Sequence, residues 1–340
     1  MKKILVVGIG RMGKGIALAF AYAGYRVVLA DSEERSSPAF ASLHDATRND
    51  LAGELQFLLE TAVITTGQAA SIAARINIVD KPQAAAQLAQ SDFVFEAVLE
   101  ALDVKQNVYA WLNQHIPDHA VVSSTTSTMS ANDLAAFVSS NHRFINAHWL
   151  NPAHLMPLVE VSPGEHTSAQ TVASMTALLE QIGKVPVVCG PLPGFIVSRI
   201  QAVALNEAAR LVEENVASAE DVDKAVKVGF GIRYATLGLL EFIDWGGGDI
   251  LFHATSYLGK NLDAQRFSIP AIVRENMLNH RNGLRDGVGF YDWNNRDVDA
   301  YRKQKLTEFV HLLQYRKLLP RAESVENPAV ENPPPGTATR

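Results

Sequence analysis

Short apolar runs and helical patterns alternate from the N-terminus of the chain. Residues Lys3 to Val7 form a short, mostly apolar run that is followed by glycines. Met12 to Ala23 then carries apolar residues at helical spacing. A second apolar run, Arg26 to Ala30, ends at Asp31. Strand, tight turn, helix and strand in this order predict a βαβ unit, in which the two strands are parallel.

The alternation continues to about residue 190. Residues 45–74 are rich in Ala, Leu and Gln and predict a pair of helices, and helical patterns also cover 104–115 and 131–139. Short apolar runs predict five further strands, at Ile76–Val79, Phe93–Phe95, Ala120–Ser123, Phe144–Ala147 and Val185–Val188. We therefore expect an α/β domain of the Rossmann type, with a doubly wound parallel sheet, over residues 1–190.

The pattern changes at Pro191. Residues 195–212 place their apolar side chains on one helix face, and Ser218 with Asp221 resembles a capping pair at the start of another helix. Alternation typical of strands is weak from there on. We expect an all-helical C-terminal domain over residues 191–320 that serves substrate binding and dimerisation.

Two apolar segments of this second domain bear on assembly. Leu237–Ile243 and Ile250–Leu258 supply apolar surface that one small domain does not fully bury, which favours a homodimer. Residues 321–340 instead contain Asn-Pro twice and a Pro-Pro-Pro run, with almost no large apolar residue. This composition predicts a disordered tail.

The composition narrows the classes of partner. With 340 residues the chain exceeds what one hydrophobic core usually serves, and its net charge of −6 offers no basic field for nucleic acid. No apolar run reaches membrane-spanning length, and only two lysines precede the first strand, so we expect neither a membrane partner nor a signal peptide. The single cysteine, Cys189, predicts a buried structural thiol in a reducing compartment. We expect a cytoplasmic protein with a small-molecule substrate.

A glycine pattern follows the first strand. Gly8, Gly10 and Gly13 form G-x-G-x-x-G: the first permits a tight turn, the second lets the backbone approach a pyrophosphate, and the third lets the helix pack on the strand. Arg11 and Met12 begin the helix, whose free N–H groups face the phosphates. An ordinary glycine turn is the alternative. The flanking strand and helix favour a dinucleotide-binding site.

The acid at the end of the second strand indicates which dinucleotide is used. Asp31 lies 18 residues beyond Gly13, where a carboxylate accepts hydrogen bonds from the adenosine ribose and repels a 2′-phosphate. This favours NAD over NADP. Arg35 lies close by, and we interpret it as a solvated surface arginine.

His148 is the candidate for proton transfer. It follows a predicted strand, and an imidazole titrates near neutral pH, as a general base requires. Glu160, 12 residues further on, could orient the ring and stabilise the imidazolium. A structural histidine and a carboxylate on a surface strand are the alternatives. None of these patterns predicts a metal site.

The chain resembles the 3-hydroxyacyl-CoA dehydrogenase family over residues 1 to about 292. The resemblance rests on motifs in a fixed order: Gly8 to Gly13, Glu96-Ala-Val-Leu-Glu100 followed by Lys105, Ser123 to Met129, His148 to Glu160, Pro193-Gly-Phe-Ile-Val-Ser-Arg199, and Gly287-Val-Gly-Phe-Tyr291. Such an ordered set is more specific than the glycine pattern alone.

The resemblance implies a role for each matching residue. His148 matches the catalytic base, Glu160 its partner, and Ser127 a hydroxyl that donates to the substrate oxygen, although Ser127 also fits a plain turn. Three residues match further NAD contacts, and one matches an asparagine beside the nicotinamide: Glu100, Lys105, Arg285 and, for the last, Asn151. Family membership also implies a homodimer.

Several positions depart from the family pattern. Ser198 replaces an asparagine that polarises the substrate, and the loop Ser124–Ser127 lacks another amide. Residues 32–80 are commonly lysine-rich in enzymes of acyl-CoA, but here they contain seven acids, three arginines and no lysine, a net charge of −4. Pro157 stands where acyl-CoA members usually have lysine, as in relatives that act on free acids, and His154 could bind a carboxylate.

Three hypotheses follow from these patterns. The first is NAD-dependent oxidation of a 3-hydroxyacyl-CoA thioester. The second is oxidation of a CoA-free 3-hydroxy acid, such as gulonate or carnitine, or a related small polar alcohol. The third, from a different class, is a non-catalytic, crystallin-like NAD-binding protein, because dehydrogenase folds are reused in that way.

Overall fold

The computed structural model describes residues 2–319 and divides into two compact units between Asn206 and Glu207. The division lies inside helix α8 (Val197–Glu213), so the first turns of this helix belong to the N-terminal unit. The tail predicted for residues 321–340 lies outside the described residues. Across residues 2–319, no helix combines the length and apolar character needed to cross a membrane.

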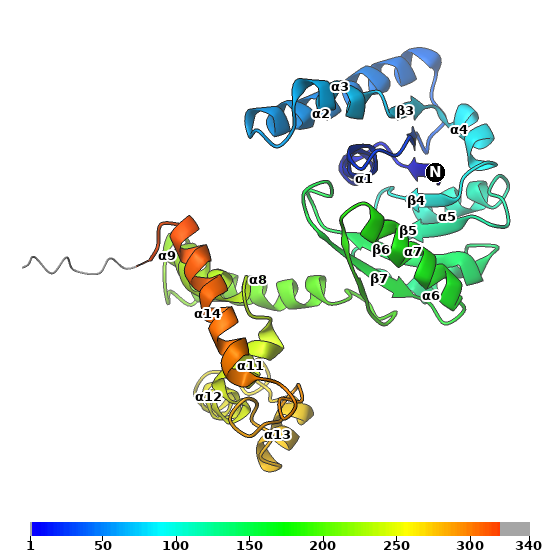
Figure 1. The fold of residues 1–340 in the computed structure, drawn as a ribbon. Helices are drawn as coiled ribbons and strands as arrows, with labels where there is room; N and C mark the ends of the chain where they lie inside the picture. The colour runs from blue at the N-terminus through cyan, green and yellow to red at the C-terminus, as the bar shows by residue number, and fades with distance from the viewer. Residues whose placement is uncertain (1, 320–340) are drawn as a thin grey trace, which may run out of the picture. The chain divides into compact units, whose positions relative to one another are not determined.

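An eight-stranded sheet forms the centre of the N-terminal unit, in the order β3-β2-β1-β4-β5-β6-β7-β8 (Figure 1). The strands are β1 (Ile4–Val7), β2 (Val27–Ala30), β3 (Ile76–Val79), β4 (Phe93–Glu96), β5 (Val121–Ser124), β6 (Phe144–Trp149), β7 (Leu158–Pro163) and β8 (Val185–Val188). The six strands from β3 to β6 in this order are mutually parallel. The predicted Rossmann fold is confirmed.

β7 departs from the predicted parallel sheet, because it pairs antiparallel with β6 while β8 runs parallel to β7. Only residues 150–157 connect β6 to β7, and so short a connection cannot form the crossover that parallel strands need. The antiparallel register sets His148 directly opposite Glu160. Residues opposite each other in such a pair have neighbouring side chains.

Helices cover both faces of the sheet. One apolar core contains residues of α1 (Arg11–Tyr22), α2 (Ser37–Glu60), α3 (Thr66–Ala73) and α7 (Ala169–Gln181). A second core, on the other face, contains residues of α4 (Lys81–Leu88), α5 (Leu102–Leu112) and α6 (Ala131–Ala135), and a 3₁₀ turn, η1 (Asn141–Arg143), precedes β6. Two buried cores separated by strands are what a doubly wound sheet requires.

The predicted helical pair is present as α2 and α3, which lie side by side (Figure 1). α2 begins at Ser37, earlier than the predicted residue 45, because Pro38 occupies its first turn, where proline is tolerated. The helix predicted over 131–139 is shorter and ends at Ala135, since Phe137 and Val138 continue only with turn-like backbone bonds to Leu134 and Ala135.

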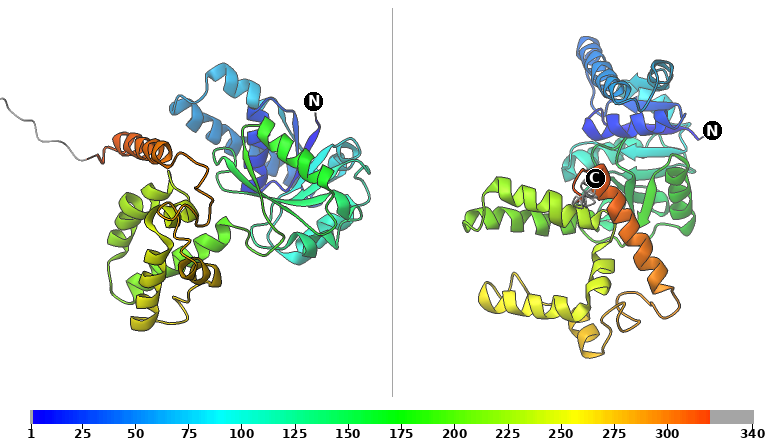
Figure 2. Two further views of the ribbon diagram at one scale, coloured as in Figure 1. Left: turned by 60° about the horizontal axis from the view of Figure 1, so that its bottom comes forward. Right: turned by 60° about the vertical axis from the view of Figure 1, so that its left-hand side comes forward.

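The C-terminal unit is helical, as predicted. It contains the rest of α8, then α9 (Ala219–Ala225), a π-helical turn η2 (Val226–Phe230), α10 (Gly231–Tyr234), α11 (Leu239–Gly246), α12 (Gly248–Asn261), α13 (Ala271–Leu278) and α14 (Val298–Tyr315). α12 and α13 pack against each other (Figure 2). The predicted cap of α9 is confirmed, because Ser218 Oγ accepts a hydrogen bond from the Asp221 amide at 3.1 Å.

A buried aspartate organises the segment after α13. Asp244 is 2% exposed, and its carboxylate accepts hydrogen bonds from the amides of Phe290 and Tyr291 at 2.9 Å and from Trp293 Nε1 at 2.8 Å. A Cβ at Gly289 would lie 2.2 Å from Asp244 Oδ1, so only glycine fits there. The Gly287–Tyr291 motif is therefore explained by packing around one carboxylate.

We expect Asp244→Ala to lower the free energy of unfolding of the C-terminal unit by about 3 kcal/mol, because it leaves buried N–H donors without an acceptor. Urea denaturation followed by circular dichroism measures this change. Asp292→Ala is the control, since the exposed Asp292 carboxylate accepts hydrogen bonds from nearby Asn294, and it should change stability by less than about 0.5 kcal/mol. Equal effects of the two variants would contradict the assignment.

Candidate active site

The three glycines of the first turn differ in what surrounds them. Gly8 has a φ of +110°, and a Cβ there would lie 2.5 Å from the Ala97 carbonyl oxygen. A Cβ at Gly13 would lie 1.8 Å from the Gly8 carbonyl oxygen. A Cβ at Gly10 would meet nothing within 4 Å. Packing within the protein therefore explains Gly8 and Gly13, whereas the space beside Gly10 is open.

This open space lies at the N-terminus of α1. Gly10 is the N-cap and supplies no side-chain hydrogen bond, and the first turn contains no acidic residue. The leading N–H groups of a helix have no partner inside it, and they favour an anion. The turn therefore fits the pyrophosphate of a dinucleotide.

Asp31 lies at the end of β2 and is buried, as a ribose-binding carboxylate should be. Its Oδ1 accepts from the Glu33 amide at 3.1 Å, and its Oδ2 accepts from Arg35 Nε at 2.6 Å. Arg35 also lies 2.7 Å from Glu33. Arg35 is exposed, as expected for a surface arginine, but its side chain also pairs with Asp31, a contact that the sequence did not predict.

His148 and Glu160 form a buried pair across β6 and β7. His148 Nδ1 lies 2.7 Å from Glu160 Oε2, and the two residues are 5% and 1% exposed. The other carboxylate oxygen, Oε1, accepts from the amides of Ile196 and Val197, each at 2.9 Å. Glu160 is therefore not a surface carboxylate but is held on both sides.

Phe195 covers the imidazole from a third direction. Its ring centroid lies 5.5 Å from that of His148, with 31° between the planes. Phe195 has a φ of +47° and follows Gly194 at +77°, so a sharp turn delivers the ring there. Sequence reasoning missed Phe195, although its place in the Pro193–Arg199 motif was a signal.

A cavity of about 590 Å³ joins the glycine turn to His148. Half of the predicted site residues line it: Gly10, Arg11, Met12, Glu100, Ser127, His148 and Asn151. Residues from β1–α1, β4, β5 and β6 thus meet at the carboxyl edge of the parallel strands, where open α/β sheets bind ligands. Asp31 ends the neighbouring strand β2 at the same edge.

Glu100 holds the loop that carries Ser127. Its Oε1 accepts from the Thr126 hydroxyl, from the Ser127 amide at 3.1 Å and from the Thr128 hydroxyl at 3.1 Å. Burial alone would raise the pKa of Glu100, but the Thr126 hydrogen bond and the Lys105 charge outweigh it and lower the pKa. An ionised Glu100 therefore fixes the position of Ser127.

Lys105 lies beneath this loop and does not line the cavity. It is fully buried, with Nζ 2.8 Å from Glu96 Oε1 and 3.3 Å from Glu100 Oε2. Tyr109 and Ser124 donate to the same Glu96 carboxylate at 2.8 and 2.7 Å. Sequence reasoning missed Glu96 as a site residue, and its position at the end of an apolar strand was the signal.

Two further predicted residues lie apart from this cavity. Ser198 is half-buried in the first turn of α8, directly after Val197. Arg285 belongs to the C-terminal unit, where its exposed guanidinium bonds Asp249 at 3.0 Å and Asp286 at 3.3 Å. The predicted thiol, Cys189, is half-buried, and burial raises its pKa.

A Rossmann sheet, an open glycine turn and a buried His–Glu pair define the class as a nicotinamide-dependent oxidoreductase. The comparisons with known proteins agree. The 3-hydroxyacyl-CoA dehydrogenase NAD-binding domain matches residues 3–191, and the 3-hydroxyacyl-CoA dehydrogenase C-terminal domain matches residues 194–293. The chain belongs to the 3-hydroxyacyl-CoA dehydrogenase family and is an NAD-dependent dehydrogenase.

Relatives of different specificity match over nearly the whole chain. A 5-formyl-3-hydroxy-2-methylpyridine 4-carboxylate 5-dehydrogenase of Mesorhizobium japonicum is 30% identical over 93% of this chain and 100% of its own. A probable 3-hydroxybutyryl-CoA dehydrogenase of Bacillus subtilis is 30% identical over 86% and 98%. The crystal structure of a 3-hydroxyacyl-CoA dehydrogenase from Archaeoglobus fulgidus has a TM-score of 0.73 and 30% identity, over 94% and 100%.

We expect Gly10→Val to raise the Kd for NADH about tenfold or more, which is at least about 1.4 kcal/mol, because its side chain enters the open space at the α1 N-terminus. Fluorescence titration with NADH measures this. Thermal unfolding should change little, since a Cβ at Gly10 meets nothing within 4 Å. Gly13→Ala is the contrast and should destabilise the fold itself. Unchanged NADH binding by Gly10→Val would contradict the placement.

Proposed function

We propose that the protein oxidises the 3-hydroxyl group of a 3-hydroxyacyl compound to a 3-oxo group, with His148 as the general base. The observation that carries the proposal is the 2.7 Å contact between His148 Nδ1 and Glu160 at the wall of the cavity that begins at Gly10. One imidazole nitrogen of His148 is held by a carboxylate, which supports a role for the other nitrogen towards the substrate.

This arrangement defines the path of the proton. Nδ1–H donates to Glu160, so Nε2 is the nitrogen that accepts the hydroxyl proton as the carbonyl forms. The negative charge of Glu160 then stabilises the imidazolium, and the amides of Ile196 and Val197 keep the carboxylate in place. NAD⁺, when bound, supplies the acceptor for the hydride that leaves the same carbon.

Other residues support the proposal by position. Ser127 lines the cavity with His148, and its hydroxyl is proposed to donate to the substrate oxygen, with Ser198 as a second hydroxyl from α8. The proposed cofactor contacts are those predicted from the sequence: Gly8, Gly10, Arg11, Met12, Gly13, Asp31, Glu100, Ser127, Asn151 and Arg285. Lys105 is proposed to act from behind, through Glu100.

We expect His148→Gln to lower kcat by about 10²- to 10⁴-fold while NADH binding stays within about twofold, because the change removes the base and not the cofactor site. Steady-state NADH formation and NADH titration measure the two effects. His166→Gln, at an exposed position, is the matched control and should leave kcat unchanged. Full activity of His148→Gln with the best substrate would refute the proposed base.

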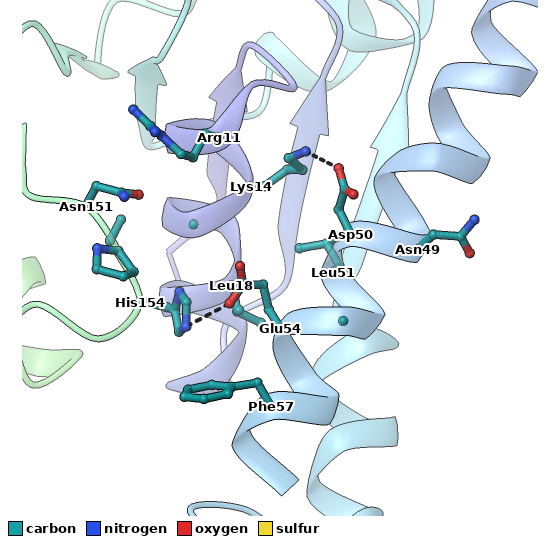
Figure 3. A pocket seen from close by; sticks show the side chains of 14 residues that line it. Arg11, Lys14, Leu18, Asn49, Asp50, Leu51, Glu54, Phe57, Asn151 and His154 are labelled. Carbon is teal, nitrogen blue, oxygen red and sulfur yellow. Dashed lines mark hydrogen bonds and ion pairs between the residues drawn. The ribbon is translucent and has the colours of Figure 1, made fainter. Parts of the chain in front are cut away.

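A second cavity bears on the substrate. It measures about 460 Å³ and lies between α1, α2 and the loop after β6 (Figure 3). Lys14 forms an ion pair with Asp50, and His154 Nε2 lies 3.5 Å from Glu54. Arg11 and Asn151 line this cavity as well as the first, so one substrate could extend through both.

The charges in this second cavity offer no positive excess to a polyanion, because Asp50 and Glu54 offset Arg11 and Lys14. Asp50 engages the ammonium of Lys14, and burial lowers the pKa of His154, which keeps its imidazole neutral at physiological pH. Glu54 adds a further negative charge beside it. A CoA-free 3-hydroxy acid or small polar alcohol is therefore the second candidate substrate, and the Mesorhizobium relative acts on a pyridine carboxylate by its name.

We expect the two candidates to separate in an assay of NADH formation with 3-hydroxybutyryl-CoA and with a panel of free hydroxy acids. No turnover of the thioester would exclude a 3-hydroxyacyl-CoA as the substrate. If the acids of α2 repel CoA, Asp50→Asn with Glu54→Gln should lower KM for the thioester roughly fivefold, about 1 kcal/mol. NAD binding with no turnover of either class would instead favour the non-catalytic alternative.

We also propose that the C-terminal unit joins two subunits and that the protein acts in the cytoplasm. Exposed apolar side chains within the predicted segments support the first: Leu240 is 45%, Ile250 61% and Tyr257 68% exposed. The single cysteine supports the second, because it cannot form an internal disulfide.

A further inference from the structure

The loop of residues 150–157 connects the two halves of the proposed catalytic pair. It leaves β6 just after His148 and enters β7 just before Glu160. Asn151 on this loop lines both cavities, and Pro152, Ala153 and His154 line the second one. The path of this short segment therefore shapes the walls on either side of the reacting group.

One lysine holds the loop from below. Lys184, between α7 and β8, donates from Nζ to the carbonyl oxygens of Met156 at 2.7 Å, Ala153 at 2.8 Å and His154 at 3.4 Å. An ammonium group has three hydrogens, and all three have acceptors within this loop. The next amide, of Val185, donates to the Pro157 carbonyl at 2.8 Å.

The environment of Lys184 is unusual for a lysine. The residue is only 8% exposed, and Nζ lies 5.6 Å from the centroid of the Trp149 ring. Among residues 2–319 Lys184 forms no ion pair with a carboxylate, and burial lowers its pKa to about 8. Burying a cation without a counter-charge costs free energy that an apolar side chain would not. The hydrogen bonds to the three loop carbonyl oxygens offset this cost.

We propose that Lys184 is a positioning residue, which fixes the backbone of residues 153–156 so that Asn151 keeps its place in the walls of both cavities. The inference rests on the proposed function, because the effect is exerted on a dehydrogenation site. Lys184 lies 36 positions beyond His148 in the sequence and belongs to none of the motifs that carry the family resemblance.

The test compares Lys184→Met, Lys184→Arg, Asn151→Ala and the double variant Lys184→Met with Asn151→Ala. We expect Lys184→Met to lower kcat/KM for the best hydroxy substrate about tenfold or more, since small displacements of groups that position the substrate slow the reaction. Lys184→Arg, which keeps the charge and the donors, should recover most of this loss. The double variant should lose little more than the larger single loss, because Lys184 acts through Asn151.

A control separates positioning from stability. Met175→Ala, on the buried face of α7, should lower the thermal unfolding temperature yet leave kcat/KM unchanged well below that temperature. If Lys184→Met fails to fold, Lys184→Gln replaces it, with a donor but no charge. Wild-type kcat/KM in the folded variant, or fully additive losses in the double variant, would overturn the inference.

A readout independent of turnover distinguishes this inference from the proposed function. Hydrogen exchange of the peptide covering residues 150–157 should be faster in Lys184→Met than in the wild type and Met175→Ala. Absence of wild-type activity on every hydroxy substrate would refute the proposed function, whereas exchange at the wild-type rate in Lys184→Met would refute the anchoring of the loop by Lys184.

Discussion

The antiparallel pairing of β6 with β7 determines the geometry of this site. A Rossmann sheet built only from parallel strands would have placed a crossover between His148 and Glu160 and separated them. The short connection reverses the chain and sets the two residues opposite each other in register. Glu160 is then bound on its far side by the amides of Ile196 and Val197, so the carboxylate cannot turn away from the imidazole. The cavity, the loop and the first turn of α8 are all arranged around this pair.

Buried charge stabilises the surrounding loops in a similar way. Glu96, Lys105 and Glu100 form a chain of contacts from the inside of the sheet to the Ser127 loop, with Tyr109 and Ser124 satisfying the remaining acceptor sites. Lys184 does the same for the loop after β6, although backbone carbonyls take the place of carboxylates. Buried ions with complete sets of partners impose one arrangement at the expense of others.

Sequence periodicity was sufficient for most of the fold, because apolar runs and helix faces are local properties. It predicted β1, α1 and β2 nearly residue by residue and the change to helices after Pro191. The antiparallel strand was missed, since strand direction depends on tertiary contacts. In the site, His148 and Glu160 were found from their types and spacing. The contacts of four other residues were not predicted, because three-dimensional packing decides which partners they meet: Arg35, Glu96, Phe195 and Lys184.

The sharing of Arg11 and Asn151 between the two cavities has a thermodynamic consequence. Both side chains are exposed, so each loses conformational freedom when a ligand on either side engages it. A ligand that arrives second would meet residues that are already ordered, which would couple the two binding equilibria. Linkage would make that coupling reciprocal: whatever a ligand in one cavity does to the affinity of the other cavity, a ligand in the other does in equal measure to the first.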